Sequence, residues 1–364
     1  MLSKENWTET TERFVRWWRR EPGDRPLMRV VARRETPVEP LEHIPTVDRP
    51  EPLYLDVARA VAVLRNQCRS VRYLGEAFPC LDLNLGPGSM ALYLGAEPVF
   101  SWDTLWYTEC VHDWEAYGMP RFDPANRWWL RHLAMIEEGV RLAGDDFPVT
   151  IPDIIENVDI LSALRGPQTF CYDLIDEPER MRALVGCIDD LYFQYYDAMH
   201  DRVRMKDGGS VYTAFKIWGP GRTAKIQCDF SAMMSPAQFR DFVKPSLEKQ
   251  CERLDHTLYH LDGPDCIRHV DALMEIERLD ALQWTAGAGQ PDGANERWLP
   301  LYDKVRAAGK GLWISIEDGG FDDWVAGAER LVKRYGSAGL YFLFPEMSEE
   351  QAQRLLDRAE SKWR

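Results

Sequence analysis

The sequence predicts an α/β protein of the (β/α)8 (TIM) barrel type with an N-terminal helical elaboration. From about Phe147 onward, short β-prone runs alternate with longer amphipathic segments. This alternation is typical of βαβ units with right-handed crossovers, and therefore of a parallel sheet. The chain has 364 residues, a length that α/β barrels commonly reach as one unit. With two earlier strand-like runs, about eight or nine strands are expected, which favours a closed barrel over an open sheet.

The N-terminal part precedes this regular pattern and is less uniform. Residues 7–20 have the spacing of an amphipathic helix, and residues 25–32 have the composition of a first strand. Residues 36–52 are dense in Pro, Glu and Asp, which indicates a surface excursion, and residues 56–64 again have helical spacing. We expect residues 1–75 to pack on a barrel formed by residues 76–364, with both parts in one structural domain.

The remaining strands and helices follow in chain order. The expected strands are 80–85, 149–151, 211–217, 225–228, 257–261, 281–284, 311–316 and 339–344. The expected helices include 178–198, 235–253 and 324–335. The Gly-Pro-Gly motifs at 86–88 and 219–221 lack the G-x-G-x-x-G spacing, so a nucleotide cofactor is disfavoured.

Composition limits the class of partner and the compartment. The formal net charge is -15, which argues against nucleic acid, because phosphate binding needs a clustered excess of Lys and Arg. Small molecules are the expected partners. Eight cysteines are scattered without a CxxC pair, which fits a reduced, cytoplasmic protein better than a disulfide scaffold or a four-thiolate zinc site. The sequence has no signal-peptide core and no apolar run of about 18 residues, so we expect a soluble protein that does not bind membranes.

His260 and Asp262 form the most informative pair of residues. The run Thr257-Leu-Tyr-His260-Leu-Asp262-Gly263 is largely apolar until an imidazole and a carboxylate appear two positions apart. In a buried parallel strand, a period of two sends both side chains to the same side at the carboxyl end, where barrel enzymes hold their catalytic groups. His260 suits a metal ligand or a general acid/base, or it is simply a hydrogen-bonded histidine. Asp262 suits a ligand, an orienting partner, a substrate contact or a helix cap.

Other strand ends also carry polar or aromatic side chains. Asp229 and Glu317 follow expected strands and are candidates for proton transfer. A cap or turn role explains Asp229 about equally well, and a surface turn of Glu, Asp and Gly is the alternative for Glu317. Asp153, Trp218 and Trp284 lie at or directly after expected strand ends as well. Because barrel enzymes surround one substrate with side chains from several strand ends, we expect these three residues to contact the substrate.

An aromatic cluster lies before the regular region. Trp102, Trp106, Tyr107 and Trp114 gather around two acidic residues within a short segment. Such rings stack on planar ligands or surround a cation through their quadrupoles, which makes Trp102 and Trp106 candidate substrate contacts. The alternative is that the rings pack a lid onto the barrel.

The order of several motifs resembles the uroporphyrinogen decarboxylase (URO-D)-like superfamily, which includes zinc-dependent corrinoid methyltransferases. The resemblance covers roughly residues 75–350 and implies a (β/α)8 barrel with its site at the carboxyl face. Related barrels often form homodimers. The motifs are Leu92-Tyr-Leu-Gly-Ala-Glu97 with Asp103-Thr-Leu-Trp106, Leu164-Arg-Gly166, Asp176-Glu-Pro178, Asp229 with Ser235-Pro-Ala-Gln-Phe239, Val243-Lys-Pro245, and His260-Leu-Asp-Gly263.

The chain departs from both branches of this family. The decarboxylases hold a carboxylate-rich tetrapyrrole with arginines of an Arg-Pro-x-Trp-x-Met-Arg-Gln-Ala-Gly-Arg motif, of which residues 25–33 keep only part. The methyltransferases bind zinc through His-x-Cys and a distant Cys. Here Asp262 replaces the first Cys, and residues 340–346 carry none. The resemblance therefore implies a harder site of His260 and Asp262 with Glu317 or Cys266, which suits zinc, another divalent ion or no metal.

Several functions remain open at this point. The leading hypothesis is a metal-assisted methyltransferase that demethylates a small methylated compound, with a corrinoid protein as a candidate acceptor. A second is a carboxy-lyase that decarboxylates a uroporphyrinogen-type tetrapyrrole without a metal. A third uses the carboxylates as a glycosidase pair, about 5 to 9.5 Å apart. The non-enzyme alternative is a barrel that only binds a ligand or serves as an accessory subunit.

Overall fold

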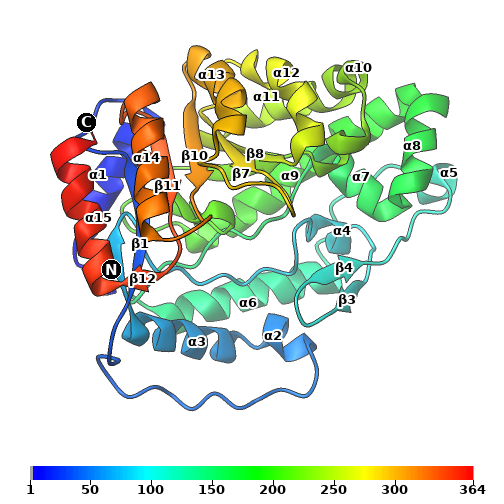
Figure 1. Ribbon diagram of the computed structural model, residues 1–364. Helices are drawn as coiled ribbons and strands as arrows, with labels where there is room; N and C mark the ends of the chain where they lie inside the picture. The colour runs from blue at the N-terminus through cyan, green and yellow to red at the C-terminus, as the bar shows by residue number, and fades with distance from the viewer. Residues whose placement is uncertain (1–2, 364) are drawn as a thin grey trace.

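A mostly parallel sheet forms the centre of the molecule, and helices pack against it in the computed structural model, which describes residues 3–363 (Figure 1). The hydrogen-bonded strand order is β12-β1-β11-β10-β9-β8-β7, and β2 pairs antiparallel with β1. The parallel sheet expected from the strand-helix alternation is confirmed. Its strands are β1 Leu27–Arg33, β2 Val71–Gly75, β7 Thr223–Gln227, β8 His256–Asp262, β9 Ala281–Thr285, β10 Gly311–Ser315, β11 Leu340–Leu343 and β12 Met347–Ser348.

The closed barrel predicted from the sequence is not shown by the strand ladders of residues 3–363. The expected strands at 80–85 and 149–151 form only isolated parallel bridges, Leu81 with Val149 and Ile151 with Tyr212. Pro148 and Pro152 flank the second of these segments. Proline has no amide proton to donate to a neighbouring strand, so it limits how far a ladder can extend. The structure therefore supports a mixed α/β fold with a long parallel sheet.

The strand predicted at 211–217 is wrong in extent, because the chain turns back within it. Strands β5 (Gly209–Tyr212) and β6 (Ile217–Pro220) form an antiparallel hairpin in which Val211 pairs with Trp218. The reversal includes two non-glycine residues in the left-handed region, Phe215 with φ 60° and Lys216 with φ 50°. No glycine or Asn-Gly pair marks this turn, so the sequence carries none of the usual hairpin signals.

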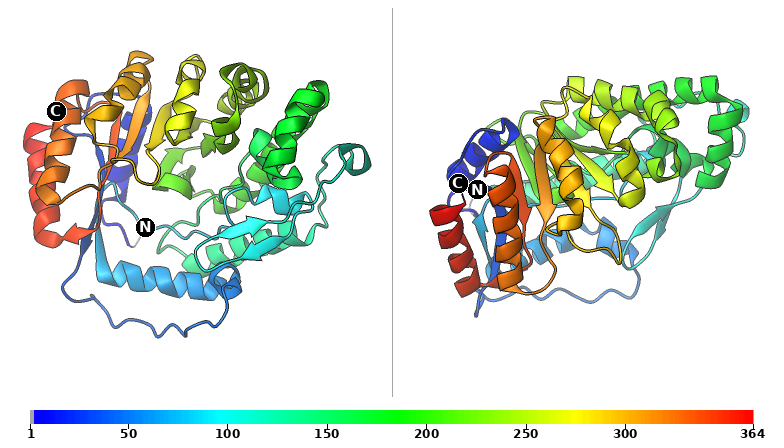
Figure 2. Two further views of the ribbon diagram at one scale, coloured as in Figure 1. Left: turned by 45° about the vertical axis from the view of Figure 1, so that its right-hand side comes forward. Right: turned by 45° about the horizontal axis from the view of Figure 1, so that its top comes forward.

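The predicted helices are present, with small differences in their ends and one internal irregularity. The segment predicted as one helix at 235–253 is divided into α10, a five-residue π-helical turn Phe239–Val243 and α11. Figure 2 shows α3 running beside α6 beneath the sheet, and the contacts between the two helices agree. The helices are α1 Trp7–Trp18, α2 Glu51–Leu55, α3 Val57–Ser70, α4 Met90–Tyr93, α5 Trp114–Tyr117, α6 Arg127–Ala143, α7 Asn157–Arg165, α8 Pro167–Asp176, α9 Pro178–Val203, α10 Pro236–Gln238, α11 Lys244–Arg253, α12 Val270–Met274, α13 Leu299–Ala307, α14 Phe321–Tyr335 and α15 Glu349–Lys362.

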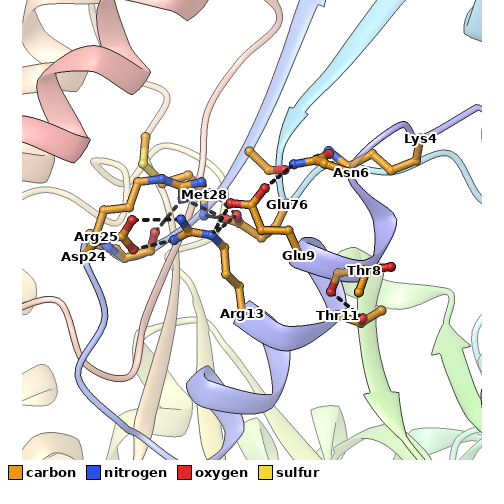
Figure 3. Close-up of polar contacts among 12 residues, drawn as sticks. Lys4, Asn6, Thr8, Glu9, Thr11, Arg13, Asp24, Arg25, Met28 and Glu76 are labelled. Carbon is orange, nitrogen blue, oxygen red and sulfur yellow. Dashed lines mark hydrogen bonds and ion pairs between the residues drawn. The ribbon is translucent and has the colours of Figure 1, made fainter.

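The first strand is fixed in the sheet by a buried carboxylate. Glu76, which directly follows β2, accepts hydrogen bonds from the Arg25 guanidinium at 2.8 and 2.9 Å and from the Met28 amide at 2.7 Å (Figure 3). Arg13 of α1 lies 3.6 Å from the same carboxylate. Both charged groups of the Arg25–Glu76 pair are almost fully buried. Arg25 is therefore engaged in holding α1, β1 and β2 together.

The excursion predicted at 36–52 contains no helix or strand before α2 begins at Glu51, within the part of the chain that is described. A small antiparallel pair, β3 (Pro98–Phe100) and β4 (Leu105–Tyr107), carries the aromatic segment.

No helix among residues 3–363 has the length and apolar character that crossing a bilayer requires.

Candidate functional site

One face of the sheet carries a row of polar side chains across three neighbouring strands. In the ladder, Gln227 of β7 is paired with His260 of β8, and His260 is paired with Gln283 of β9. Paired residues in a parallel ladder face the same side, so these three side chains form one row. Asp262 and its partner Thr285 lie two residues further along their strands, on the same face and nearer the carboxyl end. The sequence-based expectation that His260 and Asp262 share a face is confirmed.

Asp229, His260 and Asp262 lie together at this end of the sheet. One potential ligand atom from each residue lies within 4.8 Å of the corresponding atoms of the other two. Asp229 follows β7 after one residue, His260 lies on β8, and Asp262 ends that strand. Both carboxylates are exposed and the imidazole is partly buried. We call these three residues the acidic triad.

The partner of His260 defines how its imidazole is presented. Nδ1 of His260 makes a short hydrogen bond with Oε1 of Gln283, and Nε2 of Gln283 donates to Oγ1 of Thr285 at 2.9 Å. An amide oxygen only accepts hydrogen bonds, so Nδ1 carries the proton and Nε2 of His260 keeps its free electron pair. Phe215 packs against the imidazole with 5.0 Å between ring centroids. Such an imidazole is oriented to accept a proton or bind a metal through Nε2.

Asp229 is held by a second layer of polar groups. Nε2 of Gln227 donates to its carboxylate at 2.8 Å. Asp159, near the start of α7, accepts the backbone amides of Asp229 at 2.9 Å and Phe230 at 2.8 Å. These bonds fix the backbone where β7 ends, and they therefore hold the Asp229 carboxylate near His260 and Asp262.

Two carboxylates of this region, those of Asp262 and Asp159, have raised pKa values. Partial loss of contact with water raises the pKa of Asp262, His260 lowers it, and the nearby Asp229 charge raises it. Burial also raises the pKa of Asp159, again with a contribution from Asp229. None of Asp159, Asp229 and Asp262 forms an ion pair with a Lys or Arg among the residues that the structure describes. The region therefore has an uncompensated negative charge, which favours a positively charged occupant.

The donor set of the triad fits a divalent metal ion. Two carboxylates and one imidazole are oxygen and nitrogen ligands of the kind that catalytic zinc sites use, with a coordination position left for water or substrate. The same set also accepts other first-row divalent ions. Gln283 would then serve as the outer hydrogen-bond partner that orients the histidine ligand.

A cavity of about 540 Å³ opens beside the triad. It is lined by Asp229 and Asp159, by Trp106 and Tyr107 of β4, and by Phe230, together with residues of α7. Phe230 is 5% exposed and Trp106 is 65% exposed. The cavity therefore has a buried inner wall near the triad and an aromatic rim open to solvent, which is the usual shape of a small-molecule site.

Two other predicted ligands do not join the triad. Glu317 lies in an exposed turn after β10, where Ser315 donates to its carboxylate and its own amide donates to Asp292 at 2.6 Å. Cys266 is buried and accepts a hydrogen bond from Ser231 at 3.4 Å. Burial raises the pKa of the Cys266 thiol, so the sulfur favours its protonated form, which is a poor metal ligand.

The two predicted tryptophan contacts at strand ends lie elsewhere in the fold. Trp284 is one residue beyond Gln283, so the period of two turns it to the opposite face, where its ring packs 4.9 Å from Trp298. Trp218 lies on the returning strand β6, and its ring packs against Trp7 and Phe14. Both side chains are buried in packing contacts and not in the cavity beside the triad.

The remaining predicted residues divide between the cavity rim and the interior. Trp106 lines the cavity, whereas Trp102 is 56% exposed and does not line it. Asp153 is buried, and its two carboxylate oxygens are engaged by Lys225 at 2.8 Å and by the Tyr212 hydroxyl at 3.0 Å. Lys225 lies two residues before Gln227 on β7, and its ion pair gives Asp153 a structural role.

Sequence reasoning missed Gln227, Gln283 and Asp159. The two glutamines could have been found from strand periodicity, since each lies on the same face of its strand as the polar residue two positions later. Gln227 precedes Asp229 by two positions, and Gln283 precedes Thr285 by two. Asp159 has no such signal, because it lies in a helix start that no strand pattern predicts.

Comparison with known proteins supports the fold. A scan of protein-family models and a search of curated proteins both give no match, so the motif resemblance to the URO-D-like superfamily stays a prediction. Among solved structures, a methyltransferase from Methanosarcina mazei superposes with a TM-score of 0.61 at 15% sequence identity. The match covers 97% of this chain and 98% of that one. The two proteins therefore share a fold over nearly their whole length.

Proposed function

We propose that this protein is a metal-assisted methyltransferase that removes a methyl group from a small methylated compound. The observation that carries the proposal is the acidic triad, in which Asp229, His260 and Asp262 place one ligand atom each within 4.8 Å of one another at the carboxyl end of parallel strands. In α/β proteins this edge is where substrates bind. The adjoining cavity provides room for a small molecule.

The chain's own residues would bind and orient the reactants. His260 presents Nε2, Asp229 and Asp262 present carboxylate oxygens, and Gln227 and Gln283 fix two of these three side chains. A divalent ion bound by these groups would supply a Lewis acid and neutralise part of the negative charge. Asp262 would bind the ion in its ionised form, because carboxylate ligands must be deprotonated.

The transferred methyl group leaves its donor without the bonding electron pair, which stays on the donor's heteroatom. The acceptor supplies the pair for the new bond. We propose a corrinoid carried by a partner protein as the acceptor, because no residue lining the cavity within residues 3–363 is a cysteine that could serve as the nucleophile. The methyltransferase with the same fold lends support to the class of reaction. We further propose that the bridged segments near Leu81 and Ile151 complete a (β/α)8-type barrel wall.

The decarboxylase alternative is less well supported by the charges in the site. A tetrapyrrole with several carboxylates needs a basic cleft, but no Lys or Arg of the described chain lines the cavity beside the triad. Arg25, the first arginine of the partial family motif, is held in its buried pair with Glu76. For the glycosidase alternative, one oxygen each of Asp229 and Asp262 lie within 4.8 Å of each other, which is at the lower edge of the separation of about 5 to 9.5 Å that such pairs use.

The proposal is tested by metal analysis together with a methyl-transfer assay. Protein purified without chelator should contain about one divalent ion per chain, and it should methylate chemically reduced cobalamin from a methylated donor. His260→Ala should lose both properties. His43→Ala, which changes an exposed histidine of the excursion, should keep both. Absence of metal in the native protein with undiminished transfer by His260→Ala would contradict the mechanism.

A further inference from the structure

The cavity beside the triad has an unusual combination of linings. Three carboxylates face it, those of Glu109, Asp159 and Asp229, and Trp106, Tyr107 and Phe230 add aromatic rings. No Lys, Arg or His is among its lining residues in the described part of the chain. Glu109 and Asp159 are not among the proposed metal ligands, and neither forms an ion pair with a Lys or Arg within residues 3–363.

The chemistry of such a lining selects for an organic cation. Uncompensated carboxylates attract positive charge, and aromatic faces attract cations through the ring quadrupole, most strongly when the cation is weakly hydrated. An inorganic ion would gain little from the apolar part of the wall, and a neutral ligand would gain little from the carboxylates. A methylated ammonium group matches both, because its charge is spread over methyl groups that pack against rings.

We infer that this cavity binds a small methylated ammonium compound, which is the methyl donor of the reaction. The role of this compound as methyl donor rests on the proposed function, whereas its binding in the cavity does not. An ammonium nitrogen has no free electron pair, so it would lie beside the triad and not as a ligand to an ion held there. Transfer would break a C–N bond, leave its electron pair on nitrogen and release a neutral amine, while the methyl group bonds to the reduced corrinoid acceptor.

Binding of choline and of its neutral isostere 3,3-dimethylbutan-1-ol, measured by calorimetry on the full chain, tests the inference. Choline should bind at least about tenfold more tightly, because only the cation gains from the carboxylates and the ring faces. Trp106→Ala and Glu109→Gln should each weaken choline binding about two- to fivefold, as expected for one partly exposed ring or charge. Both side chains are exposed, so neither change should unfold the protein.

The matched controls are Tyr172→Ala and Glu115→Gln, which remove an exposed ring and an exposed charge outside the cavity. Both should bind choline as the native protein does. Equal affinity for choline and its neutral isostere would overturn the inference, as would demethylation of neutral methyl ethers by a protein that binds no ammonium probe. Selective choline binding by a protein that transfers no methyl group would support the cation site and refute the transferase.

Discussion

Replacing Gln283 with Leu removes the hydrogen-bond partner of the proposed metal ligand while keeping a side chain of similar size. Gln283 is 1% exposed and its Oε1 accepts from Nδ1 of His260. Outer partners of this kind typically contribute about ten- to hundredfold in metal affinity, or about 1.4 to 2.7 kcal/mol. We expect the zinc dissociation constant of Gln283→Leu to rise by that factor, as measured by calorimetric titration.

The same substitution should also reduce stability, because it leaves the His260 N–H without its protein partner. An unsatisfied buried donor costs about 1 to 3 kcal/mol, and urea unfolding of the metal-free protein would detect this loss. Thr285→Val is the matched control, since it leaves the Gln283 oxygen beside His260. Unchanged zinc affinity in Gln283→Leu, with loss of zinc binding in His260→Ala, would show that the glutamine does not orient the ligand.

Two further predictions concern stability. Glu76→Gln leaves the buried Arg25 guanidinium without its counter-charge, so the free energy of unfolding measured in urea should fall by about 3 to 5 kcal/mol. The control Glu9→Gln, at an exposed carboxylate, should change the free energy of unfolding by less than about 1 kcal/mol. Equally small effects of the two substitutions would contradict a stabilising role of the buried pair. Burial raises the pKa of Asp189 to about 7. The folded protein therefore binds more protons than the unfolded chain between about pH 4 and 7, and stability falls as pH rises through that window, by about 4 kcal/mol from this group. Asp189→Asn should remove that part of the decline in thermal scans, and an identical pH profile would refute it.

The sheet could be predicted because its strands carry local signals. Residues 257–261, 281–284 and 311–316 are short, β-prone and separated by amphipathic segments, and the structure places β8, β9 and β10 there as parallel neighbours. The segments outside this ladder were predicted less well. Prolines interrupt the segment around Val149–Ile151, and the hairpin turn at Phe215 uses a left-handed conformation that nothing in the local sequence requires.

In the candidate site too, the residues with a local sequence signal were predicted and the others were not. His260 and Asp262 were predictable because a period of two fixes their common face, and Asp229 followed from its place after a strand. Trp284 was predicted to contact the substrate because it ends a strand, but the ladder places its neighbour Gln283, and not Trp284, on the face of His260. Trp218 was misplaced because an unseen turn reverses the chain before it. Long-range packing, such as that of Trp218 on α1, leaves no mark in the local pattern.

Metal binding by the acidic triad is the central requirement of the proposed function. Calorimetric titration of zinc into the full chain should give one tight site per chain in the native protein. The double variant Asp229→Asn/Asp262→Asn keeps the shape of both side chains but removes two anionic ligands, and it should bind zinc at least about a hundredfold more weakly. Equal affinity and stoichiometry in the native protein and the double variant would contradict the account.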